Sequence, residues 1–209
     1  GVVLTHGHED HIGAVPWLVS FIKGLKVYGS PMTLALVEHK LRERGLLDRA
    51  ELITVTPEHE LALGGLRFHF IPVSHSIPQG YALAVDTPVG KVVHTGDFKI
   101  DYTPVFGDPI DLQRFAELGK KGVLALMADS TNAIRPGFTM SERTVGKTFD
   151  AIFAEHKNNR IIVATFASNV DRVQQIVNTA HKYGRKVVVE GRSMVTVMEI
   201  ARELDYINV

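Results

Sequence analysis

The chain has 209 residues, of which 45% are hydrophobic and 22% charged, an ordinary globular composition that can build one large domain or two small ones. Its 23 Lys and Arg residues balance its 23 Asp and Glu residues, so the basic surplus typical of non-specific polyanion binding is missing. No apolar run approaches the roughly 18 to 20 residues of a membrane span, and we expect no contact with a membrane. The chain has no Cys, which excludes disulfides and thiolate metal sites and is compatible with the cytoplasm, where we expect the protein to act.

Both ends of the chain indicate a longer protein. The sequence opens with Gly1-Val2-Val3-Leu4, which reads as the middle of a buried strand, and it lacks an initiator Met. It stops at Val209, directly after a predicted helix. We therefore expect a fragment that is truncated at both ends.

Apolar spacing and turn residues predict a series of elements in the first two thirds of the chain. Ser30 is a predicted N-cap followed by Pro at the first helical position, and Gly64-Gly65 is a predicted turn between two strands. In chain order we predict a strand at 2–4, a helix at 14–22, a strand at 25–28, a helix at 31–44, strands at 52–55, 60–63, 66–73, 81–86 and 91–94, a helix at 107–121 and a continuous buried strand at 123–128.

The pattern changes near Ser141, where helices and strands begin to alternate regularly. We predict a helix, a strand at 160–165, a helix at 170–182, a strand at 186–189 and a helix at 193–204. This alternation is typical of a parallel α/β unit. We place the domain boundary so that residues 1–145 form one domain and residues 146–209 begin another.

The densest chemical signal is a run of three histidines and two carboxylates within six residues, from His6 to His11. Further groups that can bind a metal follow later predicted strands, namely His75, Asp97 and Asp129. Loops at strand ends let a rigid scaffold present ligands from distant parts of the chain. Imidazole and carboxylate ligands suit zinc, manganese or iron, so we predict a metal site.

The spacing of the cluster separates it from the helical metalloprotease sequence H-E-x-x-H, whose histidines are four residues apart. Here His8 and His11 are three apart, and His6 precedes a glycine outside any predicted helix. A loop of this kind can direct His6 and His8 toward one metal while Asp10 and His11 face a second.

The spacing His6-x-His8-x-Asp10-His11, with His75 and Asp97 behind it, resembles the signature of the metallo-β-lactamase superfamily. Longer motifs resemble the ribonuclease J family, which carries an inserted β-CASP domain; they are LTHGHEDHIG at 4–13, SHSIP at 74–78, HTGDFK at 94–99, ADSTNA at 128–133, FASN at 166–169 and EGRSM at 190–194. The resemblance implies an α/β fold, with a partial αββα sandwich over 1–145 that lacks its N-terminal strands and the beginning of the parallel α/β β-CASP domain over 146–209.

The resemblance also implies a role for each matched residue. One zinc would be bound by His6, His8 and His75, and a second by Asp10 and His11, with Asp97 bridging both. Asp129 would lie beside the metals and orient a ligand or the attacking water, so the catalytic carboxylates would be Asp10, Asp97 and Asp129. Two later β-CASP histidines of the family, one of which completes the second zinc site, would lie beyond Val209, so we expect the fragment itself to be inactive.

A metal pair of this kind can activate water for attack on a phosphodiester. The resemblance implies a zinc-dependent ribonuclease, with Mn or Mg as alternative metals, that cuts RNA as a 5′-to-3′ exonuclease and an endonuclease in RNA processing and decay. It also implies a homo-oligomer, a dimer or tetramer, for the full-length protein.

Two predicted strand-to-helix turns offer hydroxyl, amide and backbone N–H groups that could bind RNA phosphate. Their residues are Ser168 and Asn169 in the first turn, and Arg192 and Ser193 in the second. The alternative for these residues is a simple helix-capping role.

Two other functions compete with the ribonuclease. One is a hydrolase of a thioester, lactone or β-lactam on the same metal scaffold, but such an enzyme has no need of the α/β continuation after Ser141. The other is a non-catalytic homologue that binds RNA, but a degenerate site usually loses some of its ligands and this one keeps all six matched positions.

Overall fold

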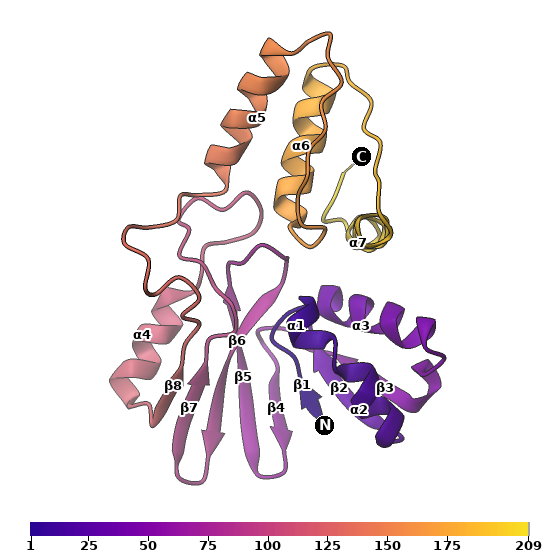
Figure 1. Cartoon of the computed structure of the whole chain (residues 1–209). Coiled ribbons are helices and arrows are strands. Elements are labelled where there is room, and N and C mark those ends of the chain that lie inside the picture. Colours follow the sequence, from indigo (N-terminus) through magenta and orange to yellow (C-terminus); the bar gives the residue numbers. More distant parts are fainter. Residues whose placement is uncertain (209) are drawn as a thin grey trace.

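The computed structural model describes residues 1–208, and its first part consists of two β-sheets packed against each other (Figure 1). The first sheet is parallel with the order β1-β2-β3, and its strands are β1 (Val2–Val3), β2 (Leu25–Gly29) and β3 (Ala50–Thr54). The second sheet has the order β4-β5-β6-β7-β8, antiparallel except for the parallel pair β7-β8; its strands are β4 (Glu60–Leu63), β5 (Leu66–Val73), β6 (Gly80–Thr87), β7 (Gly90–His94) and β8 (Ala125–Met127).

Helices cover the outer face of each sheet. On the first sheet lie α1 (Glu9–Ile12), α2 (Val15–Phe21) and α3 (Pro31–Glu43), followed by a 3₁₀ turn at Leu47–Arg49. On the second lies α4 (Leu112–Lys121). The order helix, sheet, sheet, helix is the αββα sandwich that the sequence predicted, because each sheet buries one face against the other and the second face under helices.

Successive side chains of a strand point to opposite sides. In β5 and β6 both sides are covered, one by the first sheet and the other by α4. Phe70 and Tyr81 face the first sheet and pack with their rings 5.7 Å apart. Their neighbours Ile71 and Ala82 face α4 instead. The strand-end loops that follow are thereby anchored to a core on two sides.

Helix α3 begins as the sequence predicted. The Ser30 side chain accepts a hydrogen bond from the backbone N–H of Thr33, and Pro31 occupies the first helical position. The helix buries Met32, Val37 and its neighbours against the first sheet.

The last part of the chain adds the helices α5 (Arg143–Glu155), α6 (Val170–Lys182) and α7 (Arg192–Glu203), which stand beyond one end of the sheets in Figure 1. Val170 of α6 and Ile200 of α7 join the buried cluster that also contains Val37 of α3. The two strands predicted here, at 160–165 and 186–189, are wrong: neither segment is hydrogen-bonded as a strand in the described part of the chain. A strand needs a neighbour to pair with, and no described segment pairs with either of them.

Three further predictions are corrected by the structure. The helix predicted at 107–121 begins only at Leu112, where the side chain of Asp111 accepts a hydrogen bond from the N–H of Arg114 and caps the helix. The strand predicted as buried at 123–128 is the edge strand β8, and its residues are exposed in the described chain, with Leu126 at 63%. Finally, the His cluster is not entirely a loop, because Glu9–Ile12 form one helical turn.

Among residues 1–208, no helix combines the length and apolar character needed to cross a membrane.

Candidate metal centre

The predicted metal ligands come from loops that follow three strands and meet at one end of the sandwich. His6 and His8 follow β1, His75 follows β5, and Asp97 follows β7. Asp10 and His11 lie on the single turn of α1 that continues the first of these loops.

The loop after β1 runs in close contact with α3, which leaves little room for a side chain at Gly7 between the two histidines. A Cβ atom on Gly7 would lie 2.7 Å from Leu36 Cδ1 and 3.4 Å from Thr33 Cα. Gly96, directly before Asp97, has φ +57°, and a Cβ there would lie 2.9 Å from the carbonyl oxygen of Tyr81. Both glycines let a ligand-bearing backbone approach the sandwich closely.

A first group of four side chains converges on one point. His8 Nδ1 lies 3.0 Å from His6 Nε2 and 3.0 Å from His75 Nε2. Asp97 Oδ2 lies 3.7 Å from His6 Nε2 and 3.6 Å from His75 Nε2. These four atoms belong to a set whose members all lie within 4.8 Å of one another, which is a spacing that can hold one metal ion.

Hydrogen bonds alone cannot satisfy this group. A neutral imidazole has one N–H and one lone pair, so His8 Nδ1 cannot donate to both of its neighbours. Three ring nitrogens that face one point, with a carboxylate oxygen beside them, offer their lone pairs to a common cation instead.

A second group shares the same carboxylate. His11 Nε2 lies 3.3 Å from Asp97 Oδ1 and 3.6 Å from Asp10 Oδ2. Asp97 therefore directs one oxygen to each group, which is the arrangement of a bridging ligand. Asp10 is the most open of these side chains, with 77% of its surface exposed, whereas His6 is 1% exposed.

Hydroxyl groups contact the opposite nitrogens of the histidine rings. Thr5 Oγ1 lies 3.1 Å from His6 Nδ1 and 3.4 Å from His11 Nδ1, and Ser76 Oγ lies 3.4 Å from His8 Nε2. A ring that donates its N–H to such an oxygen keeps its other nitrogen as a lone pair for the metal. The roles of Thr5 and Ser76 were not predicted, although both residues lie in the motifs; direct sequence proximity to His6 and His75 is the only signal that could have identified them.

Burial keeps the histidines of the first group neutral. Desolvation, reinforced by the nearby rings of His11, His75 and His8, lowers the pKa of His6 to about 2. Burial likewise lowers the pKa of His75 to about 4 and shifts the pKa of His8 downward. At neutral pH these rings carry lone pairs and no positive charge, as metal ligands must.

Asp129 follows β8 and is fixed by its own turn. Its N–H donates to Thr95 Oγ1, and its Oδ1 accepts from the N–H and hydroxyl of Thr131 at 3.0 and 2.6 Å. Burial alone would raise the pKa of Asp129, but the hydrogen bonds from Thr131 and the nearby His75 ring leave that pKa below its usual value. Asp129 therefore stabilises its own turn and also lies near His75. It belongs to neither group of possible ligand atoms.

The four residues predicted to bind phosphate lie at the N-termini of α6 and α7. The side chain of Asn169 caps α6 by accepting from the N–H of Arg172 at 3.1 Å, so its oxygen is already used. Ser168 is half-buried beside it, while Arg192 and Ser193 are exposed in the first turn of α7. Val170, at the N-terminus of α6, belongs to the same buried cluster as Ile12 and Ile77, which follow the predicted ligands His11 and His75 in the chain.

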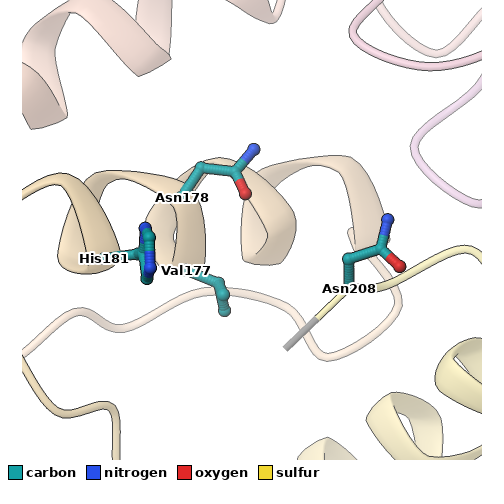
Figure 2. Close-up of a pocket in the computed structure, with 4 residues that line it drawn as sticks. All are labelled: Val177, Asn178, His181 and Asn208. Carbon is teal, nitrogen blue, oxygen red and sulfur yellow. The ribbon is translucent and has the colours of Figure 1, made fainter.

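A separate hollow of about 460 Å³ lies beside the C-terminal half of α6 (Figure 2). It is lined by Val177, Asn178 and His181 of that helix and by Asn208 near the end of the described chain. None of these residues belongs to a group that could hold a metal, so the hollow has no part in the centre.

Both parts of the chain match models of known protein families. Residues 1–113 match the family model described as a beta-lactamase superfamily domain, and residues 158–209 match the model described as the beta-CASP domain of ribonuclease J. Ribonuclease J of Synechocystis sp. is 48% identical over 209 residues, and ribonuclease J 1 of Streptococcus pyogenes is 47% identical over 208 residues. These alignments cover 100% of this chain but 32% and 37% of the relatives, so the chain spans about a third of their length.

A solved structure from Enterococcus faecalis, described as a protein of unknown function, has the same fold. It superposes with a TM-score of 0.66 at 20% identity, covering 95% of this chain and 48% of the other. The metallo-β-lactamase fold binds divalent metal ions, and the His and Asp groups described above could hold them. On the family match over more than half of its length, the chain belongs to the metallo-β-lactamase superfamily, and its similarity to ribonuclease J proteins runs along all of it.

Proposed function

We propose that the protein containing this chain is a zinc-dependent ribonuclease that hydrolyses RNA phosphodiester bonds. The observation that carries the proposal is the division of Asp97 between two ligand groups, with Oδ2 facing His6 and His75 and Oδ1 facing His11. A carboxylate shared in this way is the hallmark of a two-metal site, which suits the hydrolysis of phosphodiesters.

The donor atoms fit zinc. Four ligands arranged tetrahedrally at about 2.1 Å from zinc lie roughly 3.4 Å from one another. Four of the contacts within the first group measure 3.0 to 3.7 Å, and its three nitrogens and one oxygen are ligands that zinc accepts. Manganese is compatible with the same donors, while magnesium prefers oxygen ligands and suits the first group less well.

A metal pair held here would polarise the phosphodiester and supply a nucleophile derived from water near neutral pH. Asp10 and Asp97 would be its two anionic ligands, so two divalent ions would keep roughly two positive charges and attract the phosphate of the substrate. The exposed position of Asp10 leaves that side of the centre open to a polymeric substrate. Asp129, held by Thr131, would orient the attacking water or the substrate from the neighbouring strand end.

RNA is proposed as the substrate because relatives named ribonuclease J align with the whole chain. Cutting in both 5′-to-3′ exonucleolytic and endonucleolytic modes, cytoplasmic location and assembly into a dimer or tetramer rest on the family resemblance. The division into residues 1–145 and 146–209 and contacts between RNA phosphate and Ser168, Asn169, Arg192 or Ser193 also stay predictions.

The second group has only three side chains in the described part of the chain, and one of them is largely exposed. We propose that a ligand from the remainder of the full-length protein completes it, so that the 209-residue chain alone is inactive.

The test uses the full-length protein loaded with zinc. It is offered a 5′-monophosphorylated RNA, a thioester and a β-lactam in parallel, and metal content is measured on the same sample. The proposal predicts that RNA is cut and the two small molecules are not. Intact RNA in the presence of about two zinc ions per chain would refute the ribonuclease, and hydrolysis of the thioester or β-lactam instead would identify the competing hydrolase. Uncut RNA that binds tightly would identify a non-catalytic RNA-binding protein.

A further inference from the structure

A hollow of about 340 Å³ is formed in part by the residues that follow Asp97 in the chain. Two segments line it, the residues that follow Asp97 (Phe98, Lys99 and Ile100) and the turn that follows β8 (Asp129 to Ala133, with Phe138 and Thr139). Its volume is in the range of sites that take small organic groups of nucleotide size, roughly 300 to 1,000 Å³.

Two residues connect the lining of the hollow to the proposed centre. Phe98 is bonded in sequence to Asp97, the carboxylate shared by both ligand groups. Asp129 lines the hollow on the other side and lies near enough to His75 for that ring to affect its pKa. A substrate whose phosphate lay at the metal ligands would therefore place an adjoining unit in this hollow.

The hollow has one cation, and its position is fixed. Lys99 Nζ donates to the carbonyl oxygen of Met140 at 2.6 Å and lies 3.8 Å from Asp101 Oδ2. The Lys99 backbone N–H also donates to the carbonyl oxygen of Ser74, which ties this segment to the loop that carries His75. An ammonium group has three N–H donors, so Lys99 keeps donor capacity for a ligand after its bond to Met140.

The remaining lining offers a flat apolar surface and available polar groups. The Phe138 ring is 88% exposed, which leaves a face open for stacking. The side chains of Ser130 and Asn132 form no hydrogen bond with any residue in 1–208, so a hydroxyl and an amide are available. Proteins recognise unstacked RNA nucleotides with this combination of an aromatic face, a cation and small polar groups.

We propose that this hollow is a nucleotide subsite, which binds the RNA nucleotide adjoining the scissile phosphate. Phe138 stacks on its base, Lys99 contacts its phosphate, and Ser130 and Asn132 contact its ribose. This inference rests on the proposed ribonuclease function and adds the residues that position the substrate. Because stacking tolerates any base, the subsite binds nucleotides without strong sequence preference.

The test measures steady-state cleavage of a 5′-monophosphorylated RNA by the full-length, zinc-loaded protein and by three variants. Phe138→Ala removes the stacking face, Lys99→Met removes the cation, and Lys99→Arg retains the charge. We expect each of the first two to raise KM for RNA about 10-fold while kcat falls by a smaller factor and zinc content is unchanged. We expect Lys99→Arg to have a KM much closer to that of the unaltered protein than to that of Lys99→Met.

The salt dependence gives an independent readout of the phosphate contact. Loss of one contact to single-stranded RNA should reduce the slope of log KM against log salt concentration by about 0.7 in Lys99→Met but not in Phe138→Ala. A merely structural role for Lys99 would not change this slope.

Matched controls lie outside the lining. Ile134→Ala changes an apolar side chain that is 95% exposed on the same turn as Phe138, and Lys120→Met removes an exposed cation from α4. Both should leave KM within two-fold of the unaltered protein. If that protein cuts RNA and Phe138→Ala and Lys99→Met cut it with unchanged KM, the subsite is refuted while the ribonuclease stands. If the unaltered protein does not cut RNA, both proposals fail.

Discussion

Asp97 Oδ1 lies 3.3 Å from His11 Nε2, while the second oxygen of the same carboxylate faces a different set of histidines. This contact links the helical turn of α1 to the end of β7 and gives both groups a common carboxylate. The most direct consequences of the proposed centre therefore concern Asp97.

Replacing Asp97 by Asn should impair both metal sites, whereas replacing Asp10 by Asn should impair one. Asp97 contributes an oxygen to each group, but Asp10 contributes only to the second. Dialysis of the full-length protein against limiting zinc, followed by metal analysis, should give about two zinc ions for the unaltered protein, about one for Asp10→Asn and fewer than one for Asp97→Asn. Equal zinc content in the two variants would contradict a shared carboxylate. Asp108→Asn, an exposed change in the loop before α4, serves as the control.

Replacing Thr5 by Val should weaken metal binding without unfolding the protein. Val has nearly the same shape, but it removes the hydroxyl that contacts His6 Nδ1 and His11 Nδ1. Loss of such an outer hydrogen-bond partner typically costs about 10- to 100-fold in metal affinity. Competition with a zinc-binding dye measures the effect, and Thr54→Val, at the exposed end of β3, should show none. Equal zinc affinity in both variants would show that Thr5 does not orient the rings.

The metal-free protein should lose stability as the pH falls below about 6.5. An unfolded His binds a proton near pH 6.5, whereas burial lowers the pKa of His6 to about 2 and that of His75 to about 4. Above pH 6.5 both rings are neutral in both states, so the effect is absent there. Between pH 6.5 and 4 the unfolded state binds protons that the native state excludes, and the free energy of unfolding should fall by up to about 1.4 kcal/mol per pH unit for each ring.

Urea unfolding in the presence of a chelator measures this slope. His6→Asn should flatten it, while His156→Gln, at an exposed position after α5, should not. A slope that is identical in the His6 variant would contradict the burial effect.

Replacing Asp171 by Asn should stabilise the protein at high pH. Burial, followed by the charges of Glu142 and Asp101, raises the pKa of Asp171 to about 7. An unfolded Asp ionises near pH 3.8, so native stability falls as the pH rises from about 4 to about 7 and stays low above that. The Asn variant should gain roughly 1 to 3 kcal/mol at pH 8 and little at pH 4, as measured by urea unfolding. Asp150→Asn, at an exposed ion pair with Lys182, should not share the gain; equal behaviour of the two variants would refute the effect.

Elements governed by local signals were predictable from the sequence. Strands β4 and β5 begin and end at the predicted residues because alternating apolar side chains flank the turn at Gly64-Gly65. Helix α6 spans the predicted 170–182 because Asn169 caps it and its apolar spacing is regular.

Elements that depend on distant partners were not predictable. The segments 160–165 and 186–189 have strand-like sequences, but strand formation requires a hydrogen-bonded neighbour that sequence spacing cannot supply. The apolar run of β8 resembles a buried strand, yet its exposure depends on whether another strand or helix covers it, and Leu126 remains exposed.

The candidate site was predictable as a set of residues and not as a geometry. Spacing of His and Asp at strand ends, together with the family motifs, identified the residues that the structure brings into two groups. The orientation of Asp97, the contact of Thr5 with two rings and the close approach of Gly7 to α3 depend on how separate strands meet in space. That these groups bind zinc stays a prediction.

The most direct test of the two-metal centre is anomalous diffraction at the zinc absorption edge from crystals of the full-length protein grown with zinc. We predict two peaks about 3.5 to 4 Å apart, one among His6, His8 and His75 and one beside Asp10 and His11, with Asp97 between them. A single peak that Asp97 does not contact, or peaks only at other positions, would contradict the centre.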